Sequence, residues 1–122
     1  MDRSHANQPD PSALLDLSYI RDVQEAVGAS AMQTLVAAFL RDCREGQARL
    51  ANSPDQPAAV RAKEAHRLAG MLVQFGCPEA GNAFRAASHA APQDLPALLA
   101  KAMALAEPTC AALETLFSKQ IG

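Results

Sequence analysis

The sequence has few of the residues that favour β-sheet. Its 122 residues include no Trp, one Tyr and four Phe, and aromatic and β-branched side chains are the ones enriched in strands. Alanine, leucine, glutamate, glutamine and arginine, which favour helix, are abundant instead. A chain of this length can bury one core. The composition therefore predicts a single all-α domain.

Two further absences exclude broad classes of partner. The formal net charge is −2, so the chain lacks the positive excess that neutralises nucleic-acid phosphates. No stretch reaches the roughly 18–20 uncharged apolar residues that cross a bilayer, and the first residues lack the apolar centre of a signal peptide. We expect a cytoplasmic domain that makes no direct contact with nucleic acid or with a membrane.

Cysteine is scarce, and its spacing argues against a metal site. Cys43, Cys77 and Cys110 form an odd set without close-spaced pairs, and each lies in an apolar helical context, which is typical of reduced core thiols. A zinc or haem site built from these thiols with His66 and His89 is the alternative, but no close ligand pair supports it. We expect no metal and no cofactor. His89 lies near the end of a predicted helix, where a partial positive charge is favourable.

The chain divides into a short leader and a helical region. Residues 1–12 are polar, contain His5, Pro9 and Pro11, and show no periodicity, as in a disordered leader or a linker. Residues 13–122 carry helical periodicity. The helices are expected over about 18–27, 30–50, 58–75, 79–90 and 95–118.

Capping and helix-breaking residues set the predicted boundaries. Ser18 can cap the first helix and Gly28 can end it. Gly76 can end the helix over 58–75. Ser30 followed by Gln33 has the form of a capping box. Pro108 is expected to kink or split the last helix. The apolar stripe of the second helix is expected to be Met32, Leu35, Val36, Phe39, Leu40, Cys43 and Leu50. Short connections between amphipathic helices predict an antiparallel up-down four-helix bundle with an additional short N-terminal helix.

The helix over 58–75 places one histidine on the surface. Successive helical residues turn by about 100°, so Ala65, Leu68, Leu72 and Phe75 gather into one apolar stripe that must face the core. His66 lies roughly 150° from the centre of that stripe. The more common role of a histidine in an apolar helix, a hydrogen-bonded core residue, is therefore disfavoured.

The neighbours of His66 on its own face are mostly small. Three- and four-residue spacings bring Ala59, Ala62, Lys63, Ala69, Gly70 and Val73 beside it. Glycine within a helix costs about 1 kcal/mol relative to alanine, so Gly70 needs a reason to be there. One turn beyond His66, it leaves the imidazole accessible to another molecule.

At this point the residues match a known family. Ala65-His66-Arg67-Leu68-Ala69-Gly70, with Gly76 six residues later, resembles the signature of the histidine phosphotransfer (HPt) family. Leu15-Asp16-Leu17-Ser18 before a short helix also resembles the start of such domains, and the predicted helix order fits from about residue 14 to 118. The resemblance implies a phosphocarrier in a two-component phosphorelay, free-standing or at the C-terminus of a hybrid sensor kinase that tethers it to a membrane.

The resemblance also implies the site and the partners. His66 would accept a phosphoryl group on Nε2 from the phospho-aspartate of a receiver domain, of a hybrid kinase or a response regulator, and that partner would bring Mg²⁺. The sequence has no phosphate-binding loop, Mg²⁺-binding carboxylate cluster or nucleotide motif of its own. No second catalytic group lies near His66, so we expect a carrier without turnover of its own.

One position departs from the family pattern. The family usually has lysine three residues after the histidine, where this chain has Ala69. Lys63, three residues before His66 on nearly the same face, is the expected phosphate neighbour, although a solvated lysine is an equal alternative. Arg67 is a second candidate whose direction diverges by about 100°.

The receiver-docking surface is expected to consist of residues around His66. They are Ala59, Ala62, Ala69, Gly70, Val73 and Gln74. Scattered apolar residues on a surface are also normal without any partner. The missing lysine leaves a second function open, an HPt-like interaction module that binds a receiver without efficient phosphotransfer.

Overall fold

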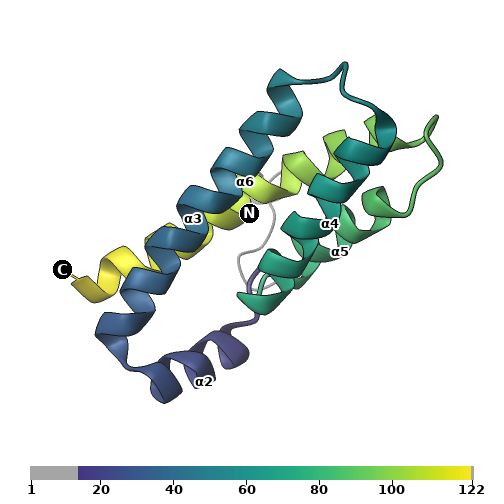
Figure 1. Ribbon diagram of the computed structural model, residues 1–122. Coiled ribbons are helices and arrows are strands. Elements are labelled where there is room, and N and C mark those ends of the chain that lie inside the picture. The colour runs from purple at the N-terminus through teal and green to yellow at the C-terminus, as the bar shows by residue number, and fades with distance from the viewer. Residues whose placement is uncertain (1–13, 122) are drawn as a thin grey trace, which may run out of the picture.

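The protein is all-helical over the residues that its computed structural model describes, 14–121, with side chains described through residue 118. The predicted leader, residues 1–12, lies outside this range. The described residues form five helices and no strand. The helices are α2 (Leu17–Val27), α3 (Ala29–Asn52), α4 (Ala58–Gln74), α5 (Pro78–Ser88) and α6 (Leu95–Ile121) (Figure 1).

Two glycines end helices as predicted, but two of the predicted N-caps are wrong. Gly28 and Gly76 have φ angles of 91° and 76°, a left-handed conformation that side chains rarely adopt and that terminates a helix. The cap of α2 is Asp16, whose Oδ1 accepts a hydrogen bond from the backbone N of Tyr19 at 3.1 Å. Ser18 lies inside that helix. Ser30 lies inside α3, which begins directly after Gly28, so no capping box forms.

Pro108 does not split the last helix. The helix α6 runs unbroken from Leu95 to Ile121 with Pro108 inside it. Proline removes the hydrogen bond to the carbonyl four residues earlier, and that residue, Ala104, is exposed to water. The next residue, Thr109, donates its hydroxyl to the Leu105 carbonyl at 2.6 Å. Because Ala104 is exposed, water can bond the carbonyl that Pro108 leaves without a partner, and the helix continues.

Sequential helices from α3 to α6 run in alternating directions (Figure 1). The helix α4 packs most extensively on α5, and α5 on α6, while α3 contacts both α4 and α6. Leu35 was expected in the apolar stripe of α3 but is 43% exposed. The largest buried side chains come from every helix but α2 and include Met32, Leu68, Leu72, Phe84, Leu99 and Leu113.

The helix α2 closes one end of α4. The backbone N of Asp16 donates to the Gly76 carbonyl at 2.7 Å, and the Tyr19 hydroxyl donates to the Gln74 carbonyl at 2.9 Å. A Cβ at Gly76 would lie 2.8 Å from Cγ1 of Ile20. The start of α2 is therefore fixed against the last turn of α4.

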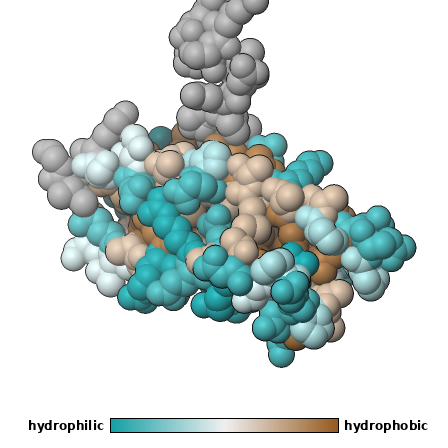
Figure 2. Space-filling model, turned by 90° about the horizontal axis from the view of Figure 1, so that it is seen from above, coloured by the Kyte–Doolittle hydropathy of each residue, from teal (hydrophilic) through white to brown (hydrophobic). Residues whose placement is uncertain are grey.

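The surface is mixed in character. In Figure 2, hydrophilic residues cover much of the face shown, and apolar residues lie between them. Within the described residues, no helix has both the length and the apolar character needed to cross a membrane.

Candidate functional site

His66 lies in the middle of α4 and is exposed, as the helical wheel predicted. Ala65, Leu68 and Leu72 are fully buried on the opposite side of the helix. Because these residues hold one side of α4 against the core, the imidazole must face away from it. Within residues 14–118, the exposed His66 makes no side-chain hydrogen bond and no ion pair, so no other side chain there occupies its ring nitrogens.

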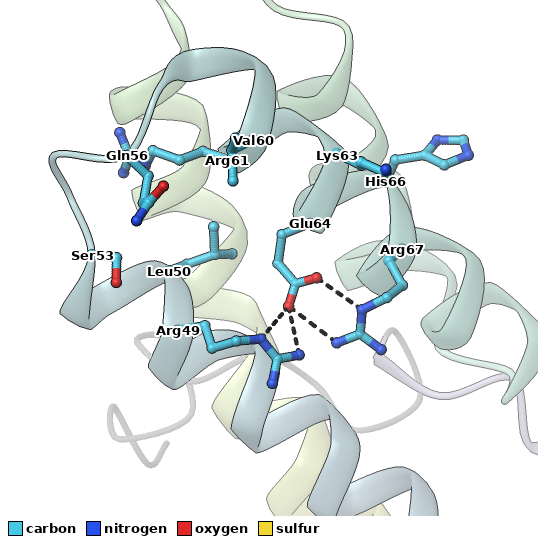
Figure 3. A pocket seen from close by; sticks show the side chains of 10 residues that line it. All are labelled: Arg49, Leu50, Ser53, Gln56, Val60, Arg61, Lys63, Glu64, His66 and Arg67. Atoms are coloured by element: carbon cyan, nitrogen blue, oxygen red, sulfur yellow. Dashed lines mark hydrogen bonds and ion pairs between the residues drawn. The ribbon is translucent and has the colours of Figure 1, made fainter.

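Gly70 leaves open space one turn beyond His66. A Cβ at this position would have no heavy atom within 4 Å. Lys63 is exposed on the same face and forms no ion pair within the described residues. Figure 3 shows Lys63 and His66 next to each other on the outer side of α4. The structure therefore brings together the histidine, the glycine and the lysine that the sequence singled out.

Ala69 does not belong to this exposed surface, contrary to the prediction. Its exposed fraction is 2%, because α5 covers that side of α4. Gly81 of α5 makes the close approach possible, since a Cβ there would lie 2.7 Å from Cγ2 of Val73 and 3.4 Å from the Ala69 carbonyl oxygen. The side chain of Ala69 packs in the core. A lysine at position 69 would therefore have its Cβ in this buried site beneath α5.

The other predicted docking residues remain at the surface. Ala59, Gly70 and Gln74 are exposed, Val73 is 40% exposed, and Ala62 is half-buried. The carbonyl of Gln74 is the acceptor for Tyr19, which is itself 40% exposed. The surface around His66 thus continues from α4 onto α2, an extension that the sequence analysis did not identify.

Arg67 belongs to an ion cluster rather than to the surroundings of the imidazole. Its Nε donates to Oε2 of Glu64 at 2.8 Å, and its guanidinium also donates to Oε1 at 3.1 Å. From α3, Arg49 donates to the same Oε1 at 2.9 and 2.7 Å. Figure 3 shows the Arg67 guanidinium turned toward Glu64, while His66 points away.

Glu64 is held in its charged form by this cluster. Its side chain is only 17% exposed. The hydrogen bond from Arg67, and then that from Arg49, lower the pKa of Glu64 below its ordinary value of 4.5 despite partial burial. The spacing of Glu64 and Arg67 is one that pairs side chains on a helix and could have been noticed in the sequence. The contribution of Arg49, from another helix, could not.

A hollow of about 630 Å³ lies on the α3 side of His66. The end of α3, residues 53 and 56 of the turn, and the first half of α4 line it, and His66 lies at its edge (Figure 3). Among the described residues, Nε of Arg61 is the one buried side-chain nitrogen or oxygen without a hydrogen-bond partner. Nothing in the sequence pattern indicated this hollow.

The thiols form no site at the surface. All three cysteines are buried, and none forms a disulfide. Burial raises the pKa of the Cys77 thiol to about 12, and the hydrogen bond with Cys43, together with burial, raises the pKa of Cys110. The same hydrogen bond lowers the pKa of Cys43, but that thiol is fully buried. A thiol that is protonated, or that no reagent can reach, is a poor nucleophile. No group of three or more His, Cys, Asp or Glu side chains within the described part of the chain could hold a metal ion.

No family model, curated protein or solved structure matches this chain. What bears on its function is therefore the arrangement of side chains around His66.

Proposed function

We propose that this protein is a phosphocarrier of the histidine phosphotransfer type, in which His66 takes a phosphoryl group from one receiver domain and passes it to another. The observation that carries the proposal is the exposed imidazole in the middle of α4, with open space at Gly70 one turn further on. The resemblance of residues 65–70 to the family signature supports it. We place such a carrier in the cytoplasm.

The chemistry requires little beyond an accessible nucleophile. Nε2 of neutral His66 would attack the phosphorus of the receiver's acyl phosphate, forming an N–P bond as the bond between phosphorus and the aspartate oxygen breaks. The aspartate carboxylate leaves, and the receiver's Mg²⁺ neutralises charge on the transferring group. Passing the group on reverses these steps. The carrier therefore needs no cofactor and has no turnover of its own.

The cationic neighbour in this proposal is Lys63. The phosphorylated imidazole carries negative charge beside the lysine, and an exposed ammonium one turn away stabilises it modestly. Arg67 is already hydrogen-bonded to Glu64 through Nε and the guanidinium. We therefore assign Arg67 to holding α4 against α3 and leave Lys63 as the phosphate neighbour.

The finer fold belongs to the same proposal. We take α3, α4, α5 and α6 as an antiparallel four-helix bundle and α2 as the additional short helix. The alternating helix directions (Figure 1) and the contacts between neighbouring helices support this arrangement. Receiver docking would use the surface around His66 formed by Ala59, Ala62, Gly70, Val73 and Gln74.

The test is transfer of a labelled phosphoryl group from a phosphorylated receiver domain. We expect acid-labile label on the wild-type protein and a loss to background in His66→Gln. The matched control is His89→Gln, which changes an exposed histidine at the end of α5 and should label like wild type. Label that persists in His66→Gln, or that disappears in His89→Gln alone, would contradict the proposal.

A second candidate is an interaction module that binds a receiver without efficient transfer. The specific observation in its favour is position 69, where a buried alanine stands in place of the family's lysine. Binding of the receiver in a pull-down with no label on any variant would select this function over the carrier.

A further inference from the structure

The hollow beside α4 has the size and position of a small-molecule site. Its volume of about 630 Å³ falls within the range of roughly 300–1,000 Å³ usual for such sites. It lies where the last turns of α3 meet the first half of α4, and Lys63 and His66 line its outer edge (Figure 3). The proposed carrier chemistry at Nε2 makes no use of it.

Positive charge predominates in the hollow. Four cationic side chains and a single carboxylate line it. Arg49 and Arg67 share the carboxylate of Glu64. Arg61 and Lys63 form no ion pair within the described residues. The hollow therefore favours an anion.

Part of the wall of the hollow is apolar and open to water. Val60 is 51% exposed and is the most exposed of the large apolar side chains in the described part of the chain. Leu50 lies across from it on α3, and both line the hollow (Figure 3). Burying such surface is favourable at about 25 cal/mol for each Å² removed from water. An occupant would gain from an apolar body as well as from a negative charge.

We propose that this hollow binds a small organic anion, with its apolar body against Val60 and Leu50 and its carboxylate, sulfonate or phosphate group accepting a hydrogen bond from the guanidinium group of Arg61. The ligand class goes beyond the carrier function and does not depend on it, because no lining contact requires a phosphorylated His66. The two can fail separately, since ligand binding is measured without any receiver domain.

The probe is anilinonaphthalene sulfonate, an apolar anion whose fluorescence rises when it leaves water. We expect saturable binding to the full chain, displaced by octanoate. Octanol has the apolar body without the charge, and inorganic phosphate has the charge without the body. Displacement by octanol or by phosphate at the same concentration as octanoate would overturn the proposal.

Two substitutions locate the probe. Arg61→Met keeps an unbranched apolar side chain and removes the donor, and we expect the Kd to rise about tenfold, the usual worth of a charge-assisted hydrogen bond. Val60→Glu places a carboxylate in the hollow and should raise the Kd at least as much. Val60 is half-exposed, so this variant should fold, and its thermal unfolding verifies that it does.

The matched control is Arg21→Met in a different hollow, lined by α2 and the start of α3. It should leave the Kd of the probe unchanged. An equal effect of Arg21→Met, or no effect of either substitution at the proposed site, would show that the probe binds elsewhere and would overturn the assignment.

Discussion

The two sides of α4 are built in opposite ways. Where α4 faces Gly46 of α3, Glu64, Arg67 and Leu68 leave no room for a side chain at that position. On the outer side, His66 meets solvent, and no atom lies within 4 Å of a Cβ built at Gly70. The packed side fixes the position of α4, and the outer side leaves His66 open to solvent.

The difference explains two glycines that look alike in the sequence. Both Gly46 and Gly70 lie inside helices, where glycine is unfavourable. A Cβ at Gly46 would lie 2.7 Å from Cδ2 of Leu68 and 2.9 Å from a guanidinium nitrogen of Arg67. Gly46 is therefore required for packing. No packing contact requires Gly70, which is consistent with a role in access to His66.

The largest expected effect tests the packed side. Gly46→Ala should lower the free energy of unfolding by up to about 2 kcal/mol, because overpacking costs about 1–3 kcal/mol while the better helix propensity of alanine returns about 1 kcal/mol. Leu68 is fully buried and has little room to move. Urea unfolding at neutral pH measures the change. A gain in stability would mean that α4 does not sit against α3 as described.

The second prediction compares two clusters of ion pairs, one centred on a glutamate on the packed side of α4 and one centred on an arginine of α3. In one, Glu64 lies between two guanidiniums. In the other, Arg44 lies between Glu107 and Glu114, at 2.9 and 3.1 Å. Glu64 is 17% exposed, whereas Glu107 is 58% exposed. Ion pairs open to solvent contribute little, so only the first cluster should matter for stability.

Glu64→Gln should therefore destabilise the protein by about 1 kcal/mol at pH 7, since charge-assisted bonds are replaced by weaker ones. Glu107→Gln is the matched control and should change stability by less than about 0.5 kcal/mol. The cluster lowers the pKa of Glu64 below 4.5, so its contribution is complete above that pH and is lost as the pH falls through the lowered pKa. The difference between wild type and Glu64→Gln should shrink below pH 4.5. A difference that stays constant with pH would refute the assignment.

Much of this comparison could be predicted from local sequence. The periodicity of residues 65–75 placed His66 on the outer side of α4, and Gly28 and Gly76 marked helix ends. Each of these signals lies within one helix or one turn, and the structure confirms them. The phosphorelay function itself stays a prediction.

What the sequence could not provide depends on contacts between helices. Ala69 was expected at the surface because a helical wheel does not show where a second helix packs, and α5 covers it through Gly81. The hydrogen bonds from Arg49 to Glu64 join α3 to α4. A wheel of one helix does not show them either. Ser18 was predicted as the cap, and Asp16 is the cap in the structure. Both residue types cap helices well, and local sequence does not separate them.

The smallest expected effect tests the open side. Gly70→Ala should raise the free energy of unfolding by about 0.5–1 kcal/mol, because alanine is favoured in a helix and its methyl group meets no atom of the protein. If this face receives a receiver domain, the same methyl group should slow phosphotransfer to His66. Urea unfolding and a transfer time course measure the two. Lower stability would show that the space is filled, and an unchanged rate would remove Gly70 from the docking surface. Stability and transfer rate should thus move in opposite directions at Gly70, whereas at Gly46 the substitution is expected to act through stability alone.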